Sequence, residues 1–177
     1  MQVKAILISG TMGSGKTTVL SEASDILLSK RIVHAAIDLD TLGIAHLPDG
    51  VVDDLLFRNL ASVWANYRAA GVTRLLVAEA LESTVDLERI RNAIGEAEIV
   101  VCRLSAKQEI ARQRVRTREP GMLQERFVRR VAQLDRILDV AGLEDFSIQN
   151  DHTSVSDVAR ELLMRAGWLG SVENRST

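Results

Sequence analysis

Residues 10–17 read Gly-Thr-Met-Gly-Ser-Gly-Lys-Thr, a spacing of glycine, lysine and threonine that can hold a chain of phosphates. Glycines at these positions let backbone N–H groups turn toward an anion without obstruction by side chains. A helix that begins directly after the turn presents its positive N-terminus to the same charge. Lys16 can then reach the terminal phosphates, and the Thr17 hydroxyl can ligate Mg²⁺. The pattern Gly-x-x-x-x-Gly-Lys-Thr therefore predicts a site for a nucleoside triphosphate.

The segments on either side of this turn have the structure that the motif requires. Residues 3–9 are a short apolar run rich in β-formers, which predicts a buried parallel strand. Residues 17–30 carry apolar side chains at helical spacing. The alternative is a chance glycine-rich turn, and the fixed positions alone would arise by chance with a probability on the order of 1% in a chain of this length. The strand–turn–helix context favours the phosphate-binding loop.

Acidic residues follow two further predicted strands. Asp38 and Asp40 come after the strand at residues 32–37, at the edge where ligands bind in open α/β sheets. The alternative is that an aspartate here only caps a short helical turn. Glu79 lies near the end of the predicted strand at residues 74–80, where an acid can meet Mg²⁺ through water. A solvent-facing acid at a strand end is the equal alternative for Glu79, and Glu82 is a weaker metal candidate.

Arginines dominate the predicted helix of residues 106–118, where they alternate at Arg112, Arg114, Arg116 and Arg118. A Pro-Gly break follows, and the next predicted helix, residues 123–140, carries a second basic cluster at Arg126, Arg129 and Arg130. Two helices joined by a break can form a mobile lid, and the planar guanidinium fork suits phosphate oxygens. The alternative is that these arginines form charged faces in contact with water.

The rest of the chain continues to alternate between strands and helices. Further elements are predicted as strands at residues 98–104 and 146–149 and as helices at residues 51–70, 85–94 and 154–166. Such alternation predicts a three-layer α/β fold with a parallel sheet covered on both faces. Because no linker or repeat divides the chain, we expect one domain over residues 1–170 and a frayed tail over residues 171–177.

The sequence resembles the P-loop small-molecule kinases, which include adenylylsulfate, shikimate and gluconate kinases, chloramphenicol phosphotransferase and the nucleoside monophosphate kinases. The resemblance covers about residues 3–166 as a pattern of motifs, of which the phosphate-binding loop is highly specific. Asp40-Thr41-Leu42 is similar to the Asp-Ser-Leu run of chloramphenicol phosphotransferase, and Asp38-Leu39-Asp40 to the Asp-Gly-Asp of adenylylsulfate kinases. The resemblance implies the P-loop NTPase fold with a five-stranded parallel sheet in the order 2-3-1-4-5, a short helical lid at about residues 112–130, and Mg-ATP as the phosphoryl donor.

The resemblance also implies catalytic roles. Lys16 would stabilise the charge of the transferred phosphoryl group. Asp40 would position and deprotonate the acceptor, with Asp38 supporting the substrate or the metal. Arg114 and Arg118 best match the Arg-x-x-x-Arg pattern of the lid in these kinases and would close over the phosphates.

Residues 43–71 correspond to the segment that covers the phosphate acceptor in these kinases. Arg58 and Tyr67 are therefore candidate substrate-binding residues, together with Asp38 and Asp40. Trp64 lies three residues before Tyr67 on the same predicted helix. The alternative for both aromatic side chains is that they pack this helix onto the sheet.

Residues 146–155 resemble the segment between the last strand and last helix of these kinases, where the backbone cradles adenine. The alternative is that Asn150 or Asp151 caps the turn, with Ser154 capping the last helix. The predicted metal-facing residues are Thr17 and Glu79. The predicted nucleotide-binding residues are Gly10, Thr11, Met12, Gly13, Ser14, Gly15, Lys16, Thr17, Thr18, Arg114 and Asn150.

Composition excludes several other classes of protein. The chain has 177 residues and a formal net charge of −2, so it lacks the basic excess of a general nucleic-acid binder. The single cysteine, Cys102, excludes an internal disulfide framework. No apolar run is long enough to span a membrane, and the N-terminus has no secretory signal, so we expect a cytoplasmic protein. Motifs that read guanine or mark transporter ATPases are absent.

These observations lead to two hypotheses. The first is an enzyme that transfers the γ-phosphate of ATP, with Mg²⁺, to an unidentified small-molecule acceptor such as a nucleotide, a metabolite or an antibiotic hydroxyl. The second is a module that binds ATP for sensing or for contact with a partner, without phosphoryl transfer. The sequence does not predict an oligomeric state.

Overall fold

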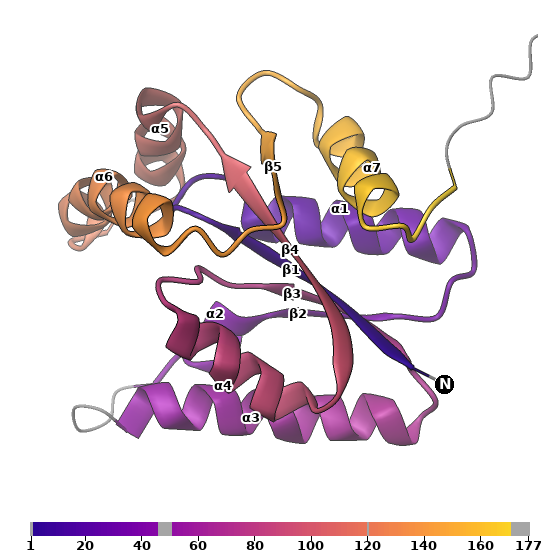
Figure 1. Ribbon diagram of the computed structural model, residues 1–177. Helices are drawn as coiled ribbons and strands as arrows, with labels where there is room; N and C mark the ends of the chain where they lie inside the picture. The colour runs from indigo at the N-terminus through magenta and orange to yellow at the C-terminus, as the bar shows by residue number, and fades with distance from the viewer. Residues whose placement is uncertain (1, 46–50, 120, 171–177) are drawn as a thin grey trace, which may run out of the picture.

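A five-stranded parallel sheet forms the middle layer of the computed structural model (Figure 1). The structure describes residues 2–45, 51–119 and 121–170. The strands lie in the order β2-β3-β1-β4-β5, which confirms the order that the resemblance implied. Their bounds are β1 (Val3–Gly10), β2 (Ala35–Asp38), β3 (Arg74–Ala78), β4 (Ala97–Ser105) and β5 (Phe146–Gln149).

Helices cover both faces of this sheet and complete a three-layer α/β fold (Figure 1). Helices α1 and α7 pack against each other on one face, and α3 and α4 pack together on the other. Helices α5 and α6 form a hairpin beside the end of β1. The helix bounds are α1 (Lys16–Ser29), α2 (Leu39–Leu42), α3 (Val51–Ala69), α4 (Thr84–Ile94), α5 (Gln108–Arg118), α6 (Gln124–Ala141) and α7 (Val155–Arg165).

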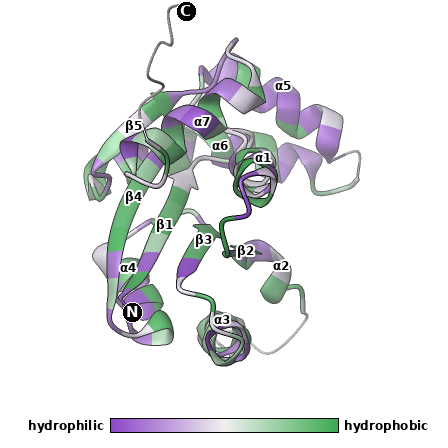
Figure 2. Ribbon diagram, turned by 90° about the vertical axis from the view of Figure 1, so that its right-hand side faces the viewer, coloured by the Kyte–Doolittle hydropathy of each residue, from purple (hydrophilic) through white to green (hydrophobic). Residues whose placement is uncertain are grey.

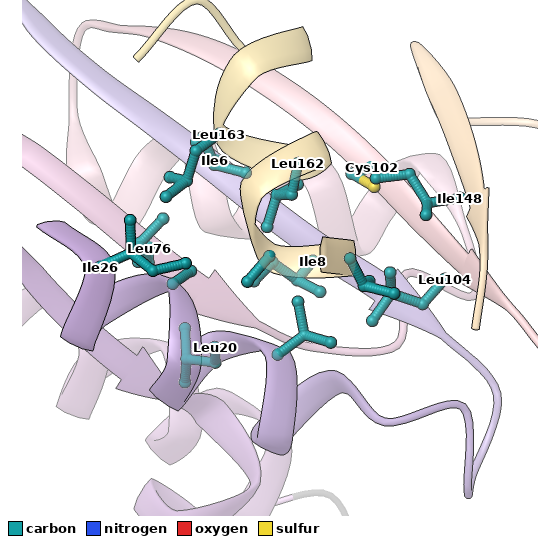
Figure 3. Packing of buried hydrophobic residues seen from close by; sticks show 14 of the residues in the cluster. Ile6, Ile8, Leu20, Ile26, Leu76, Cys102, Leu104, Ile148, Leu162 and Leu163 are labelled. Carbon is teal, nitrogen blue, oxygen red and sulfur yellow. The ribbon is translucent and has the colours of Figure 1, made fainter. Parts of the chain in front are cut away.

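Side chains of the central strands point alternately toward the two helical layers. On β1, Ile6 and Ile8 are fully buried in the cluster that contains Leu20 of α1 and Leu162 of α7 (Figure 3). Leu7 of the same strand packs into the opposite cluster, under α3 and α4. Because both faces are covered, β1 reads as one continuous apolar run, and Figure 2 shows β1 and β4 as predominantly hydrophobic.

The aromatic side chains of α3 separate into two roles. Trp64 is buried in the cluster between α3 and the sheet, and its Nε1 donates a hydrogen bond to the carbonyl of Ile94 at 3.1 Å. The packing alternative is therefore confirmed for Trp64. Tyr67, one turn later, is 40% exposed and lies at the far end of α3, where its backbone carbonyl accepts a hydrogen bond from Val72.

Three local features differ from the boundaries that the sequence predicts. Strand β2 begins at Ala35 rather than at residue 32, because the chain is still turning out of α1: Ile32 donates its N–H to Leu27, and Arg31 has a positive φ. Strand β3 ends at Ala78, so Glu79 lies just beyond it rather than inside it. The short helix α2 directly after β2 was predicted only as the helical turn of the capping alternative.

A buried arginine ties α6 to the sheet. The side chain of Arg103 on β4 is 9% exposed and pairs with Asp135 at 2.9 Å and Asp139 at 2.7 Å on α6. Its third partner is Glu144, at 3.6 Å, on the connection to β5. Closer to the start of α6, the Thr11 hydroxyl donates to the Val131 carbonyl at 2.9 Å. Helix α6 is therefore fixed both to β4 and to the loop after β1.

Some sequence predictions lie outside the described residues. These are the part of the acceptor segment at residues 46–50 and the frayed tail at residues 171–177. The single domain over residues 1–170 stays a prediction. Within the described parts of the chain, none of the helices combines the length and the apolar character needed to cross a membrane.

Candidate functional site

The candidate residues converge because the parallel strands all end at one edge of the sheet. Strand β1 leads into the loop of residues 11–15, β2 ends at Asp38, and β3 stops one residue before Glu79. Asp38 stands beside Ala78 in the β2–β3 register, and the Glu79 N–H donates to the Ile8 carbonyl at 3.1 Å. The carboxyl ends of β2, β3 and β1 thus bring these acids beside the loop.

The loop after β1 requires glycine at two positions. Gly13 and Gly15 have φ values of 76° and 97°, in the left-handed region that side chains disfavour. A Cβ on Gly13 would lie 2.3 Å from the Ala111 carbonyl oxygen of α5, and a Cβ on Gly15 would lie 2.4 Å from Nδ2 of Asn150. These close approaches hold the loop between α5 and the segment after β5.

Side chains from distant segments donate hydrogen bonds to carbonyl groups of this loop. Nδ2 of the buried Asn150 donates to the Ser14 carbonyl at 2.7 Å, and Nη1 of Arg114 donates to the Gly13 carbonyl at 3.3 Å. The C=O and N–H of a planar trans peptide point in opposite directions. Because Asn150 holds the Ser14 carbonyl, the N–H of Gly15 faces away from it, an orientation that can hold a phosphate oxygen.

Lys16 begins α1 and folds back over the loop. Its Nζ donates to the Gly10 carbonyl at 3.0 Å and approaches the Thr11 carbonyl at 3.5 Å. Burial lowers the pKa of Lys16 from its ordinary value, and the negative charges of Asp40, Glu79 and Asp38 oppose that shift. The ammonium group of Lys16 is therefore shielded from water and lies near three acids. Among the described residues, it forms a salt bridge with none of them.

Asp38 has two structural partners at the end of β2. Its Oδ2 accepts a hydrogen bond from the Thr17 hydroxyl at 2.6 Å, and its Oδ1 accepts one from the backbone N–H of Asp40 at 3.2 Å. The second bond makes Asp38 the N-cap of α2, so the capping alternative holds for this residue. The first bond joins it to the hydroxyl that the sequence assigns to Mg²⁺.

Asp40 is exposed, and it borders a hollow of about 50 Å³ at the mouth of the loop. The same hollow is lined by Lys16, Thr17, Thr18 and Arg118. Arg118 comes from the end of α5, where its Nε donates to Glu119 at 2.8 Å. The loop, the end of β2 and the end of α5 therefore contribute side chains to one small space.

Glu79 occupies a different environment from the two aspartates. Its Oε1 accepts a hydrogen bond from the Ala80 N–H at 2.8 Å, while its buried Oε2 has no hydrogen-bond partner among the described residues. Burial, and next the charge of Asp40, raise the pKa of Glu79 from 4.5 to about 8. Glu79 is therefore protonated at neutral pH in the free protein.

The pKa of Glu79 makes a prediction about stability. Because the folded state holds this proton up to about pH 8 while the unfolded chain releases it near pH 4.5, the free energy of unfolding should fall as the pH rises between these values. The expected loss is on the order of a few kcal/mol. Glu79→Gln should flatten this decline, since an amide does not ionise.

Urea unfolding at pH 5, 6.5 and 8 measures the decline directly. Asp25→Asn is the matched control, because Asp25 is an exposed acid on α1. A Glu79→Gln protein that shows the same slope with pH as the wild type would contradict the assignment of this proton to Glu79.

Two larger cavities flank the loop. One, of about 490 Å³, lies between α5 and the segment after β5, and Arg114, Arg118 and His152 line it. The other, of about 330 Å³, lies on the opposite side of the loop between α3 and the segment after β3, and Glu79 lines it. A further cavity, of about 1000 Å³, lies between the end of α3 and the start of β4 and contacts none of the predicted site residues.

The structure does not bring every predicted residue to this site. Tyr67 lies at the amino end of the sheet, near the start of β3, so its position gives no support to a role in substrate binding. Arg58 is exposed on α3 and does not line the cavity beside Glu79, although its neighbour Phe57 does. Ser154 caps α7, as the capping alternative predicted. Asp151 instead accepts a hydrogen bond from the Lys107 N–H at 2.7 Å, at the start of α5.

Sequence reasoning missed part of the cavity beside Glu79. Phe57, Asp86 and Arg89 line it. Asp86 forms a reciprocal capping box with Ser83 at the start of α4. The spacing of these two residues is the local pattern that could have drawn attention to Asp86. Arg130 was noted only as part of a basic cluster, yet its Nη2 contacts both carboxylate oxygens of Glu82, at 2.6 and 2.7 Å.

The residues present fit a triphosphate with a divalent metal. Among the described residues, no group of three or more His, Cys, Asp and Glu side chains could hold a metal ion alone. The Thr17 hydroxyl and the Asp38 carboxylate are already joined at the end of the loop, and they supply two oxygens of the hard type that Mg²⁺ prefers. Phosphate oxygens commonly complete such a site.

Comparisons with known proteins agree with this architecture. No family model matches the sequence, and no curated protein is significantly similar to it. Among solved structures, a tunicamycin resistance protein from Deinococcus radiodurans is similar with a TM-score of 0.63 and 15% identity, over 95% of this chain and 98% of that one. A sugar kinase from Janibacter has a TM-score of 0.61 and 19% identity, over 92% of this chain and 93% of that one.

Shikimate kinase from Acinetobacter baumannii, solved with shikimate, has a TM-score of 0.60 and 19% identity, and the match covers 92% of each chain. At such low identity these similarities concern the fold. They agree with the three-layer α/β fold and its parallel sheet in the order β2-β3-β1-β4-β5. The chain therefore has the fold of the P-loop small-molecule kinases.

Proposed function

We propose that this protein is an ATP-dependent phosphotransferase that moves the γ-phosphate of ATP to a hydroxyl group of a small molecule. The observation that carries the proposal is the small hollow at the mouth of the loop, where Lys16, Thr17, Asp40 and Arg118 meet. It combines a cation, a metal-binding hydroxyl, an exposed acid and a second cation. Phosphoryl transfer requires mainly positioning and electrostatic stabilisation, which such a set supplies.

Each residue has a distinct task in the transfer. The loop N–H groups and Lys16 hold the phosphates, and Lys16 leaves its carbonyl partners to meet the charge that develops on the transferred group. Asp40 accepts the proton of the acceptor hydroxyl as the new O–P bond forms and the bond to ADP breaks. Mg²⁺, when bound, would neutralise phosphate charge, and Thr17 and Asp38 are the residues that would hold it.

The two flanking cavities divide the substrates between them. We assign the nucleoside to the cavity of about 490 Å³, because Arg114 joins it to the loop and Arg118 borders both it and the central hollow. We assign the acceptor to the cavity of about 330 Å³, because Glu79 lines it and lies close enough to Lys16 to influence its pKa. The γ-phosphate would then lie between the two, near Asp40.

A thermal-shift measurement followed by a turnover assay tests this proposal. A ligand that binds only the folded state raises the melting temperature, and at about 100 times its Kd the rise for a chain of this size should be about 5–10 °C. We expect this rise with Mg-ATP. Release of ADP is then measured against a panel of nucleosides, nucleotides, sugars, sugar acids and antibiotics.

Two results would contradict the proposal in different ways. The absence of a thermal shift with Mg-ATP would contradict nucleotide binding itself. A shift with Mg-ATP but no ADP release with any hydroxyl compound in the panel would instead support the alternative of an ATP-binding module without transfer.

A further inference from the structure

One side chain of the phosphate loop makes a contact that the proposed transfer does not use. Thr11 is buried, with 2% of its surface exposed, and its hydroxyl donates a hydrogen bond to the Val131 carbonyl of α6 at 2.9 Å. The two residues lie 120 positions apart in the sequence. The hydroxyl of Thr11 is therefore committed to α6 rather than to a phosphate oxygen.

The backbone of Thr11 helps to shape the loop. Its carbonyl accepts a hydrogen bond from the Ser14 N–H at 3.2 Å and lies 3.5 Å from Nζ of Lys16. The side chain of the next residue, Met12, packs against the buried cluster between α5 and α6, which consists of Ala111, Val115, Val128 and Val131. The position of Thr11 on α6 therefore determines where the turn of the loop lies.

An ion pair holds α6 directly beside this contact. Arg130, the residue before Val131, contacts both carboxylate oxygens of Glu82, at 2.6 and 2.7 Å. Glu82 belongs to the connection between β3 and α4, on the acceptor side of the loop. An arginine that meets both oxygens of a carboxylate is fixed in orientation as well as in distance. The ion pair therefore fixes the same turn of α6 that receives the Thr11 hydroxyl.

A loop that already has its binding conformation binds phosphates more tightly than a loose one. A loose loop loses conformational freedom when an anion arrives, and this loss lowers the affinity. Here Asn150 holds the loop from the side of β5, while Thr11 attaches it to α6. The second attachment is only as firm as α6 itself, and therefore depends on Arg130 and Glu82.

We propose that Thr11, Arg130 and Glu82 are positioning residues for the triphosphate. The ion pair fixes α6, and the Thr11 hydroxyl transmits the position of the helix to the phosphate loop. Glu82 thereby raises the affinity for phosphates from the acceptor side of the site without contacting them. This inference rests on the proposed function in one step, the binding of phosphates at the loop.

Two phosphate probes, inorganic tripolyphosphate and Mg-ADP, test the role of Thr11. Their Kd values for the whole protein are measured by titration calorimetry. Thr11→Val keeps the shape of the side chain and removes its hydroxyl, whereas Thr11→Ser keeps the hydroxyl. We expect Thr11→Val to raise both Kd values by about three- to tenfold, and Thr11→Ser to stay within about twofold of the wild type.

The two halves of the ion pair separate positioning from simple electrostatics. Glu82→Gln removes a negative charge and Arg130→Gln a positive one, so charge alone would strengthen phosphate binding in the first variant and weaken it in the second. Positioning through α6 predicts that both variants weaken binding, each by about two- to fivefold. The titrations are made in about 0.3 M NaCl, which screens charges more than about 6 Å apart.

Double variants and a distant ion pair serve as controls. In the Thr11→Val background, neither Glu82→Gln nor Arg130→Gln should weaken binding further, because the connection to the loop is already lost. Glu98→Gln removes one partner of the ion pair with Lys4, 3.1 Å long and at the other end of the sheet, and should bind both probes as the wild type does.

The outcomes distinguish this inference from the proposed function. If the wild type binds neither probe, the proposed function fails first. If the wild type binds both and Thr11→Val binds them equally well, the role of Thr11 is overturned. If Glu82→Gln binds more tightly and Arg130→Gln more weakly, the pair acts through its charges and positioning is overturned. Should Thr11→Val lose its cooperative melting transition, the comparison of these two variants decides alone, since both side chains are partly exposed.

Discussion

Replacing Lys16 with alanine is expected to lower the rate of phosphoryl transfer by about 10²–10³-fold, the usual cost of removing one preorganised charge partner of a transition state. Among the residues that the structure describes, the hydrogen-bond partners of Lys16 Nζ are two carbonyl oxygens, those of Gly10 and Thr11, and burial lowers the pKa of Lys16. Among the described residues, no ion pair compensates for the loss of water around this ammonium group. Phosphate oxygens of a bound nucleotide would supply that compensation.

The same argument predicts that the Lys16→Ala protein stays folded. The substitution removes a buried charge together with one hydrogen bond of 3.0 Å and one longer contact of 3.5 Å to backbone carbonyls, so the melting temperature without nucleotide should change by only a few degrees. Lys30→Ala is the matched control, since Lys30 is exposed at the other end of α1. ADP release and melting curves are measured on both variants. A Lys16→Ala enzyme with transfer within a factor of about three of the wild type would refute the role of Lys16.

Asp40→Asn should reduce kcat by about 10²–10⁴-fold, the range that general-base catalysis contributes, while leaving the Kd for Mg-ATP nearly unchanged. The structure separates the two aspartates in a way that supports this expectation. Asp38 is held by the Thr17 hydroxyl and by the start of α2, whereas Asp40 is exposed beside the central hollow. An amide keeps the shape of the side chain but cannot accept the proton.

Asp38→Asn is the informative comparison for this prediction. Because Asp38 contacts Thr17 at 2.6 Å, its loss should raise the Mg²⁺ concentration needed for half-maximal activity, which Asp40→Asn should not do. Both are measured by titrating Mg²⁺ at saturating ATP. Equal activity of wild type and Asp40→Asn would assign proton transfer elsewhere, and a raised Mg²⁺ requirement in Asp40→Asn would assign this residue to the metal instead.

The sequence predicted best what local spacing determines. The loop of residues 10–17 was found because four positions in eight residues carry its chemistry, and its glycines have the positive φ values or close contacts that explain them. The strands and helices were found because buried parallel strands and amphipathic helices have distinct periods. Their order in the sheet followed only from the resemblance to kinases, since spacing along the chain does not say which strands are neighbours.

Contacts between distant segments lay beyond such reasoning. The bond from Asn150 to Ser14 joins residues 136 positions apart, and the pair of Glu82 and Arg130 joins residues 48 apart. For Tyr67 the sequence predicted a position near the site, whereas the side chain lies far from it. Its helix starts near the site, but a helix rises about 1.5 Å per residue, so a side chain 16 positions after Val51 lies about 24 Å along the axis.

The attachment of α6 determines how the α5–α6 hairpin can move. Arg103 holds the second half of α6 to β4 through Asp135 and Asp139, and Thr11 of the phosphate loop holds the middle of the helix at Val131. We therefore expect the second half of α6 to stay fixed to the sheet. Arg118 and the end of α5 should move relative to it, with the hinge near Val131. Since Thr11 belongs to the loop after β1, we expect a ligand that changes the conformation of this loop to shift the Thr11–Val131 contact and, with it, the α5–α6 hairpin.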